Sequence, residues 1–453
     1  MLLLFLDGMQ KHIPITKKEI EVSIGLSREW DAKAAGREVA QAAIKKLKTP
    51  PSFLLLFSTI HYKKHGGFKQ FLEGVWEVLP KNTPLVGGTI TGFITNDGCF
   101  ARGAAALALS YVNIDVVLAQ GSHTKRKPKS AAKNCADQIN YGLKGSKFKN
   151  KFLFNIISGP TVANLPYLGK INVIKSNFFG GMAAKLGVRF FSLIEYGWGK
   201  EEEIIENIGT RLPDYYIFGG SAVDSGEISE NYQFLDRMVL KNSIVSLGCS
   251  IDLPIFLKTN LSVHETDKIF EVTDTKRNER IIKNLDNKPA KQQILDVFGV
   301  KYDQLEDLKA FYYKISNYFP VASKEDKRLT SGIAGFFGDN VFLGYKLKGK
   351  SIRLLTTTGK EALSVVDKTF KNLDVKKFPF LFMSYSSILV SFLGNQVYTL
   401  KERIDEYVDG TPYLIICPIN ENSGNPNETA VSHVYSFNVM SIDVDNLNKM
   451  IFN

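Results

Sequence analysis

Apolar runs and amphipathic stretches alternate along the chain, and their spacing predicts alternating strands and helices. Residues 31–47 carry apolar side chains at four-residue intervals, which is the spacing of one helix face. Residues 53–58 (FLLLFS) are continuously apolar, which is typical of a strand covered on both faces. A second helical stripe at 68–79, a short strand at 84–88 and, after a turn, a strand at 102–110 follow. The pattern predicts a unit with the order helix, strand, helix, strand, turn, strand.

The same order of elements returns twice more along the chain. An insertion at about 159–198 interrupts the second copy, whose helices and strands are predicted at 130–143, 151–158, 200–212, 215–220 and 232–250. The third copy is predicted at 359–373, 378–384, 398–408, 412–417 and 432–442. Because helices alternate with apolar strands and each unit ends in a hairpin, we predict an α/β fold class with mixed β-sheets layered with helices.

The three copies divide into two expected domains. A tail or short strand covers 1–20, a domain with two units covers 21–250, and a domain with one unit covers 251–453. Ahead of its unit, the second domain is predicted to contain two strands, two helices and a hairpin, at 255–260, 268–274, 289–298, 302–315 and 341–355.

Segments of both expected domains resemble the FIST domain family. VSIGLS (22–27), PLVGG (84–88) and YYIFGGSAVDSG (215–226) resemble parts of the FIST N-terminal domain. NLDNKPAKQQILDVFG (284–299) and SHVYSFNVMSI (432–442) resemble parts of the FIST C-terminal domain. The resemblance implies tandem FIST domains that bind a small ligand, with amino acids as proposed ligands, and that take part in signal transduction. It implies a sensor or adaptor rather than an enzyme.

The sequence also departs from the family at four elements, one of which is the closing strand, where the usual His-Asn-His-Thr is replaced by the residues at 433–436. The first turn of the family usually reads Gly-Cys-Ser-x-x-Gly-Glu, and here Phe93 stands at the place of the glutamate. Tyr385 begins the region where a Cys-x-x-Arg element is usual, and Asn420 and Glu421 replace the Gly-Glu of a later turn. The family's residues at these positions therefore do not carry over to this chain.

Two glycine pairs end predicted strands, and each is followed by a hydroxyl side chain. Glycine lets a ligand approach the backbone, and ligands of α/β sheets bind at the carboxyl ends of strands. Tight packing between strand and turn is the alternative explanation of these pairs. Together with three residues of the third unit they form the predicted ligand-binding set: Gly87, Gly88, Thr89, Gly219, Gly220, Ser221, Cys417, Asn420 and His433.

The sequence gives weaker support for a catalytic, phosphate-binding or metal-binding site. Cys417 and His433 are a possible nucleophile and base, but no acid at a recognisable spacing supports them, so we assign no catalytic residue. Residues 344–351 match the sequence pattern of a phosphate loop, GxxxxGK[ST]. A phosphate loop requires a helix directly after it, however, and here a strand is predicted. The six histidines and four scattered cysteines lack metal-ligand spacing, so we expect no metal and no cofactor.

Composition and charge further limit the classes of protein and of partner that the sequence allows. The chain has 453 residues, of which 44% are hydrophobic, which excludes a mostly disordered protein. It shows no apolar run of membrane-spanning length and no secretory signal pattern, so we expect a cytoplasmic protein without membrane contact. The net charge is +11, and residues 121–151 hold nine Lys or Arg and one Asp. Such a run is typical of a solvated loop and helix face, and the alternative is a docking patch for an acidic partner or nucleic acid. Few aromatic residues accompany this patch, which argues against nucleic acid.

These observations predict a sensory protein that binds a small polar metabolite such as an amino acid and reports to an unidentified signalling protein. Two alternatives stay open. The chain is an interaction adaptor without a metabolite ligand, or it is an uncharacterised hydrolase or transferase.

Overall fold

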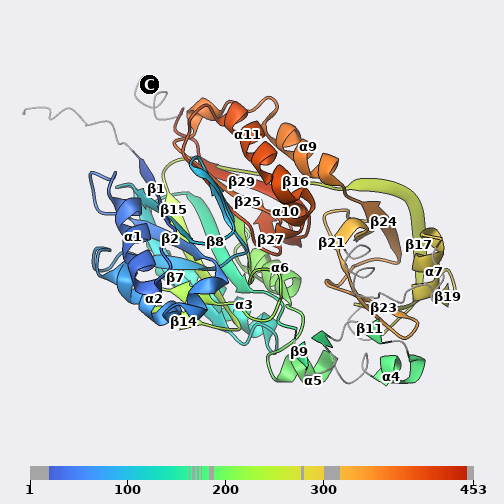
Figure 1. Cartoon of the computed structure of the whole chain (residues 1–453). Coiled ribbons are helices and arrows are strands. Elements are labelled where there is room, and N and C mark those ends of the chain that lie inside the picture. The colour runs from blue at the N-terminus through green and yellow to red at the C-terminus, as the bar shows by residue number, and fades with distance from the viewer. Residues whose placement is uncertain are drawn as a thin grey trace, which may run out of the picture.

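The computed structural model describes residues 20–162, 164–165, 169–170, 173–174, 176–182, 188–276, 280–299 and 317–445. Within these residues, three six-stranded mixed sheets carry helices on their outer faces, and a fourth, larger sheet lies beside them (Figure 1). The predicted α/β class with mixed, layered sheets is confirmed. No helix in these ranges has the length and apolar character needed to cross a membrane.

The three six-stranded sheets have the same strand order. The first contains, in spatial order, β1 (Glu21–Ser27), β6 (Ala104–Ser110), β2 (Phe53–Ser58), β3 (Leu85–Thr89), β13 (Gln233–Leu235) and β14 (Met238–Leu240). The second contains β7 (Ile114–Ser122), β15 (Ser243–Ile251), β8 (Asn150–Ser158), β12 (Tyr215–Ala222), β27 (Glu421–Gly424) and β28 (Val431–His433). The third contains β16 (Ile255–Leu261), β29 (Ser436–Ile442), β25 (Leu381–Tyr385), β26 (Tyr413–Ile416), β4 (Phe93–Thr95) and β5 (Gly98–Phe100).

The hairpin at the end of each sheet comes from a different unit of the chain. Hairpin β13–β14 of the second unit pairs with β3 of the first, and β27–β28 of the third unit pairs with β12 of the second. Hairpin β4–β5 of the first unit pairs with β26 of the third, which closes the cycle. The closing hairpin expected in the first unit from strands at 84–88 and 102–110 is wrong, because β2 lies between β3 and β6. The observed hairpins use other, shorter strands, and they join the three sheets to one another.

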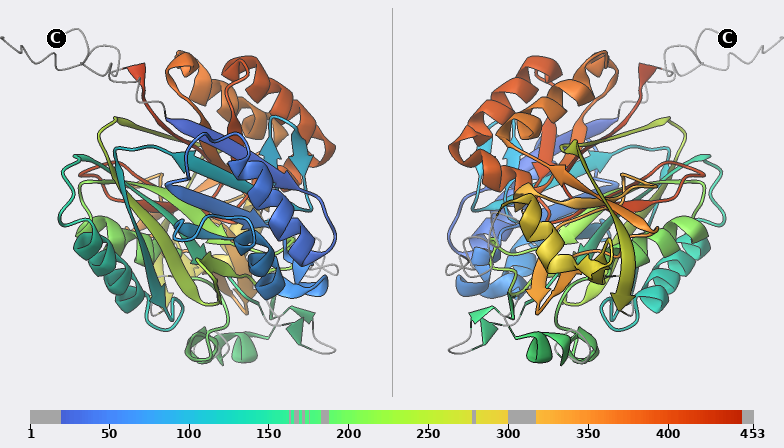
Figure 2. Two further views of the ribbon diagram at one scale, coloured as in Figure 1. Left: turned by 90° about the vertical axis from the view of Figure 1, so that its left-hand side faces the viewer. Right: turned by 90° about the vertical axis from the view of Figure 1, so that its right-hand side faces the viewer.

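Each sheet buries its outer face under helices of its own unit (Figure 2). These helices are α1 (Ala32–Ile44) and α2 (Gly67–Trp76) on the first sheet, α3 (Pro128–Gly142) and α6 (Glu201–Arg211) on the second, and α9 (Gly359–Phe370), α10 (Ser387–Leu393) and α11 (Val397–Val408) on the third. Apolar spacing explains the packing, because Ala35, Val39 and Ala43 form the buried stripe of α1.

The inner faces of the three sheets share one core. Phe57 of β2, Phe154 of β8 and Phe382 of β25 come from one sheet each, and their rings contact one another at centroid distances of 5.9, 5.8 and 5.4 Å. Such tilted and edge-on ring contacts are favourable beyond simple burial. The common core therefore fixes the three sheets around one centre.

The fourth sheet is inserted between β16 and α9 of the third unit (Figure 1). It contains, in order, β11 (Val173–Ile174), β22 (Ile333–Phe337), β23 (Asn340–Leu343), β18 (Ile281–Leu285), β17 (His264–Lys276), β24 (Ser351–Thr356), β20 (Val321–Ser323) and β21 (Thr330–Ser331), with β19 (Lys288–Pro289) beside β18. Helix α7 (Ala290–Val297) packs on it. Strand β11 comes from the insertion of the second unit, which also carries α4 (Asn177–Met182) and α5 (Val188–Leu193).

This inserted sheet corrects two sequence predictions. The hairpin expected at 341–355 is wrong, because β23 pairs with β18 and β22 whereas β24 pairs with β17 and β20. The segment expected ahead of the third unit lies inside it, since β16 is the edge strand of the third sheet. The helix expected at 289–298 is confirmed as α7, and the one expected at 302–315 lies outside the described residues. The two-domain division stays a prediction.

Candidate functional site

A cavity of about 340 Å³ opens where the three sheets meet the inserted sheet. Thr91 follows β3, Val223 follows β12 and Asn420 follows β26, and all three residues line the cavity. Gly344 and Tyr345 of the inserted sheet line it as well. The cavity thus lies at the carboxyl ends of one parallel strand from each unit, which is where α/β sheets bind ligands.

Backbone hydrogen bonds join these three strand ends in a ring. The N–H of Val223 donates to the carbonyl of Thr89 (3.0 Å), and the N–H of Thr91 donates to the carbonyl of Cys417 (3.2 Å). The N–H of Ser221 donates to the carbonyl of Asn420 (2.9 Å). Each unit is bonded to the other two, so the strand ends that border the cavity are held in fixed positions.

Glu201, the first residue of α6, contributes a buried carboxylate to the cavity wall. Only 1% of its surface is exposed, and its Oε1 accepts a hydrogen bond of 3.4 Å from Nδ2 of Asn420. Burial, together with the neighbouring charge of Glu202, raises the pKa of Glu201 to about 7. This carboxyl group is therefore suited to accept a hydrogen bond or a positive charge from a ligand.

Lys125 is a second buried charge near the cavity. Its Nζ donates to Oγ1 of Thr161 (2.6 Å) and to Oδ1 of Asn242 (3.3 Å). Burial lowers the pKa of Lys125 to about 8, although the charges of Glu201 and Glu195 act in the opposite direction. Glu201 in the cavity wall and Lys125 are therefore two opposite buried charges, each of which acts on the pKa of the other.

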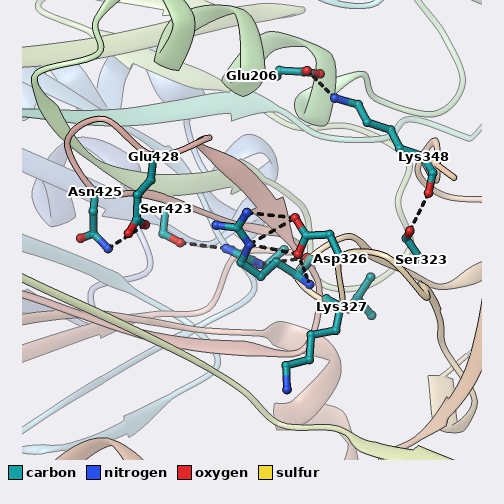
Figure 3. A network of polar contacts seen from close by, with 11 residues as sticks. Glu206, Ser323, Asp326, Lys327, Lys348, Ser423, Asn425 and Glu428 are labelled. Carbon is teal, nitrogen blue, oxygen red and sulfur yellow. Dashed lines mark hydrogen bonds and ion pairs between the residues drawn. The ribbon is translucent and has the colours of Figure 1, made fainter.

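The inserted sheet is held against α6 by polar contacts. Arg280 forms a buried ion pair with Glu202 and donates from Nη2 to the carbonyl of Gly199 at 2.8 Å. Lys348 pairs with Glu206 on the same helix (Figure 3). These contacts fix one wall of the cavity relative to another.

A polar loop at 224–230 forms a further part of the wall. The carboxylate of Asp224 accepts hydrogen bonds of 2.7–3.3 Å from the backbone N–H groups of Gly226, Ile228, Ser229 and Glu230. Such a carboxylate replaces several missing backbone partners at once. It gives the loop one defined conformation beside the cavity.

The sequence pattern of the FIST N domain matches residues 52–288, which is more than half of the chain. The chain belongs to the FIST family. FIST domains are a family of small-ligand-binding signalling domains. The search of curated proteins found no match.

Solved structures similar to this FIST protein include two cyanuric acid hydrolases. The first shares 7% identity at a TM-score of 0.33, covering 93% of this chain and 99% of that chain. The second, from A. caulinodans, shares 7% identity at a TM-score of 0.31, covering 94% and 100%. A likeness this low says nothing about the activity of the FIST protein.

The structure brings several of the predicted binding residues of this FIST protein together. Thr89, Ser221, Cys417 and Asn420 take part in the backbone ring beside the cavity, and the side chain of Asn420 contacts Glu201. The side chain of Thr89 faces its own sheet, where its Oγ1 accepts from the N–H of Tyr232 at 3.1 Å.

The glycine pairs lie inside strands, one step before the cavity. A Cβ atom at Gly87 would lie 1.7 Å from the carbonyl oxygen of Leu56, and one at Gly219 would lie 2.0 Å from that of Asn155. A Cβ atom at Gly88 would lie 2.8 Å from the carbonyl oxygen of Tyr232, and one at Gly220 would lie 2.7 Å from that of Asn420, so both are crowded as well. Close approach of adjacent strands accounts for these glycines, and none of the four lines the cavity.

Cys417 and His433 belong to different sheets. The N–H of Cys417 donates to the carbonyl of Gly92 (3.0 Å), and burial raises the pKa of its thiol. On β28, the ring of His433 contacts Oγ of Ser423 (2.8 Å) and the carbonyl of Arg328 (3.3 Å), and burial lowers its pKa to about 4. The ring lines a polar hollow that is distinct from the cavity. Figure 3 shows Ser423, Asn425 and Glu428, which line the same hollow. No hydrogen bond joins the cysteine to the histidine in the described part of the chain.

Sequence reasoning missed Glu201 and Lys125. Glu201 begins a run of three glutamates, and Lys125 stands in a strongly basic stretch, so both resemble solvated surface residues. Their burial is the signal that marks them, and only the fold supplies it. In the ranges that the structure describes, no cluster of three His, Cys, Asp or Glu side chains could hold a metal ion.

Proposed function

We propose that this FIST protein binds a small polar metabolite, such as an amino acid, in the cavity and signals the binding to a partner protein in the cytoplasm. The observation that carries the proposal is the buried carboxylate of Glu201 in the cavity wall. A buried charge is unfavourable unless a partner compensates it, and a ligand ammonium group is such a partner.

The size and lining of the cavity support a ligand of this kind. Its volume of about 340 Å³ is at the small end of the range for metabolite sites. Trp198, Ile228 and Val434 provide apolar wall for a carbon skeleton, and Ser387 and Asn420 provide polar atoms. Of the residues predicted from sequence, we propose Asn420 as a direct ligand contact and His433 as a residue outside the site. The others shape the strand ends.

We propose that the position of the cavity allows ligand binding to change the protein in a way that a partner detects. A ligand there contacts the three-sheet core and the inserted sheet together, so it stabilises the arrangement in which both are in place. A signalling partner with an acidic surface is expected at the basic patch, where Arg126, Lys127, Lys129 and Lys133 are exposed. The partner contact is tested by reversing Lys127, Lys129 and Lys133, while Lys125 is left intact because it is buried.

The ligand is tested by thermal denaturation of the full chain with a panel of amino acids at millimolar concentration. A ligand present at about 100 times its dissociation constant stabilises the folded protein by about 2.7 kcal/mol. We expect one or more members to raise the melting temperature of the wild type and of a Glu203→Gln control, but not of Glu201→Gln. Glu203 lies in the same helical turn and does not line the cavity. A panel without any stabilising member contradicts the proposal, as does full stabilisation of Glu201→Gln.

A further inference from the structure

A hollow of about 450 Å³ lies at the opposite end of the second sheet from the cavity. It is formed where α3 ends and where β8 and β12 begin. Its lining includes four lysines, Lys144, Lys147, Lys149 and Lys151, together with the buried ring of Tyr215. We call it the lysine hollow.

Most of the positive charge in the lysine hollow has no carboxylate partner. Lys151 pairs with Asp214 at 2.7 Å. In the described part of the chain, no ion pair involves Lys144, Lys147 or Lys149, and all three are exposed. The nearby carboxylate of Asp115 accepts a hydrogen bond from Ser146 at 2.6 Å instead. Three ammonium groups therefore lie around one concavity without an ion-pair partner among the described residues, and a bound anion relieves their mutual repulsion.

Fold stability accounts only in part for these lysines. A cation near the C-terminus of a helix is stabilised by the helix dipole, and Lys144 lies two residues after the end of α3. Lys147 and Lys149 come further along the chain, beyond the reach of this effect. The ammonium group of Lys147 lies 5.5 Å from the centroid of the Phe148 ring, a weak contact at an exposed site, and no ion pair in the described residues involves Lys147 or Lys149.

The side chains of the lysine hollow favour phosphate over carboxylate. Arginine binds carboxylates with a planar pair of donors, and the lining contains no arginine. Lysine ammonium groups bind phosphate as mobile point charges. Asn140 and Ser146 add neutral polar groups to the lining. We propose that the lysine hollow binds a small anion that carries two or more phosphate groups.

The test measures binding of inorganic tripolyphosphate to the full chain by calorimetry at low ionic strength, with sulfate and a polyglutamate peptide as further probes. We expect tripolyphosphate to bind at least about ten-fold more tightly than sulfate, with an affinity that falls as salt is added. The triple variant Lys144→Gln/Lys147→Gln/Lys149→Gln is expected to lose at least about ten-fold in affinity.

The matched control is Lys127→Gln/Lys129→Gln/Lys133→Gln, which removes the same charge from exposed residues at the start of α3, outside the hollow. This control is expected to keep its affinity within about two-fold. An equal loss in both triple variants indicates diffuse attraction and overturns the proposal. Absence of tripolyphosphate binding overturns it as well, and so does tighter binding of polyglutamate through the same three lysines, which indicates an acidic protein segment. Stabilisation by amino acids is expected to be unchanged in both variants, which separates this site from the cavity.

Discussion

Replacing Glu201 by glutamine is expected to stabilise the unliganded protein at mildly alkaline pH. Burial raises the pKa of this carboxyl from its ordinary value of 4.5 to about 7 in the folded state. Each pKa unit corresponds to about 1.4 kcal/mol, so the ionised side chain lowers the free energy of unfolding by about 3 kcal/mol. Glutamine has nearly the same shape, carries no charge and keeps an oxygen for the amide of Asn420.

The pH dependence gives this effect a clear signature. Because the folded pKa is raised, the penalty is absent below the unfolded pKa of 4.5, grows as the pH rises, and is complete above about 7. Denaturant unfolding of the wild type and of Glu201→Gln, followed from about pH 5 to about pH 8, is expected to show a gap that widens toward about 3 kcal/mol. Glu203→Gln, the control in the same turn, is expected to follow the wild type. Parallel curves for the wild type and Glu201→Gln, or a loss of stability in that variant at pH 8, refute the reasoning.

Three further substitutions test the structure around the cavity by denaturant unfolding. Arg280→Met removes the ion-pair partner of the Glu202 carboxylate and is expected to destabilise the protein by about 3–5 kcal/mol, whereas a change below about 1 kcal/mol contradicts this role of the ion pair. Gly87→Ala places a Cβ atom against a neighbouring carbonyl and is expected to cost about 3 kcal/mol, whereas Gly145→Ala, which meets open space, is expected to be neutral. Asp224→Asn turns amide hydrogens toward backbone N–H donors, so we expect it to lower the free energy of unfolding by about 1–3 kcal/mol and to weaken ligand binding. If the amides of 226–230 keep their protection from hydrogen exchange in this variant, Asp224 does not have this role.

The order of strands and helices follows from the sequence because each element carries its own periodicity. The continuous apolar run at 53–58 and the stripes of α1 and α11 are local signals, and the structure has these elements at the expected places. The exchange of hairpins between units could not be predicted from such local signals. Strands β4 and β13 have only three residues each, and a turn looks the same whether its arms pair with their own sheet or with another.

The inserted sheet was misread for a related reason. Strand β16 pairs with β29, which lies far along the chain, and no local pattern records such a distant partner. The apparent hairpin at 341–355 satisfied the alternation of strand residues, but each arm finds its partners elsewhere in the sheet.

Sequence reasoning found the part of the candidate site that lies in the turns after strands. It did not find the part that is defined by the burial of a charged side chain. Asn420 was included as a residue of the turn that resembles a family element in the third unit, and the fold places it at the cavity. Glu201 carries the charge in the cavity wall, yet its sequence context is a run of acidic residues at the start of a helix. Acidic residues are favourable at that place in any helix, so the run gave no hint of a site.

The central claim is that a ligand ammonium group binds the ionised carboxylate of Glu201. Calorimetric titration of the most stabilising amino acid near pH 7, in buffers of different ionisation enthalpy, measures the protons released on binding. Because about half of the Glu201 carboxyls carry a proton at that pH, we predict release of about half a proton per ligand in the wild type, and no binding to Glu201→Gln over the same range of ligand concentration. Binding with the same proton release in both proteins, or binding without any proton release in the wild type, contradicts the claim.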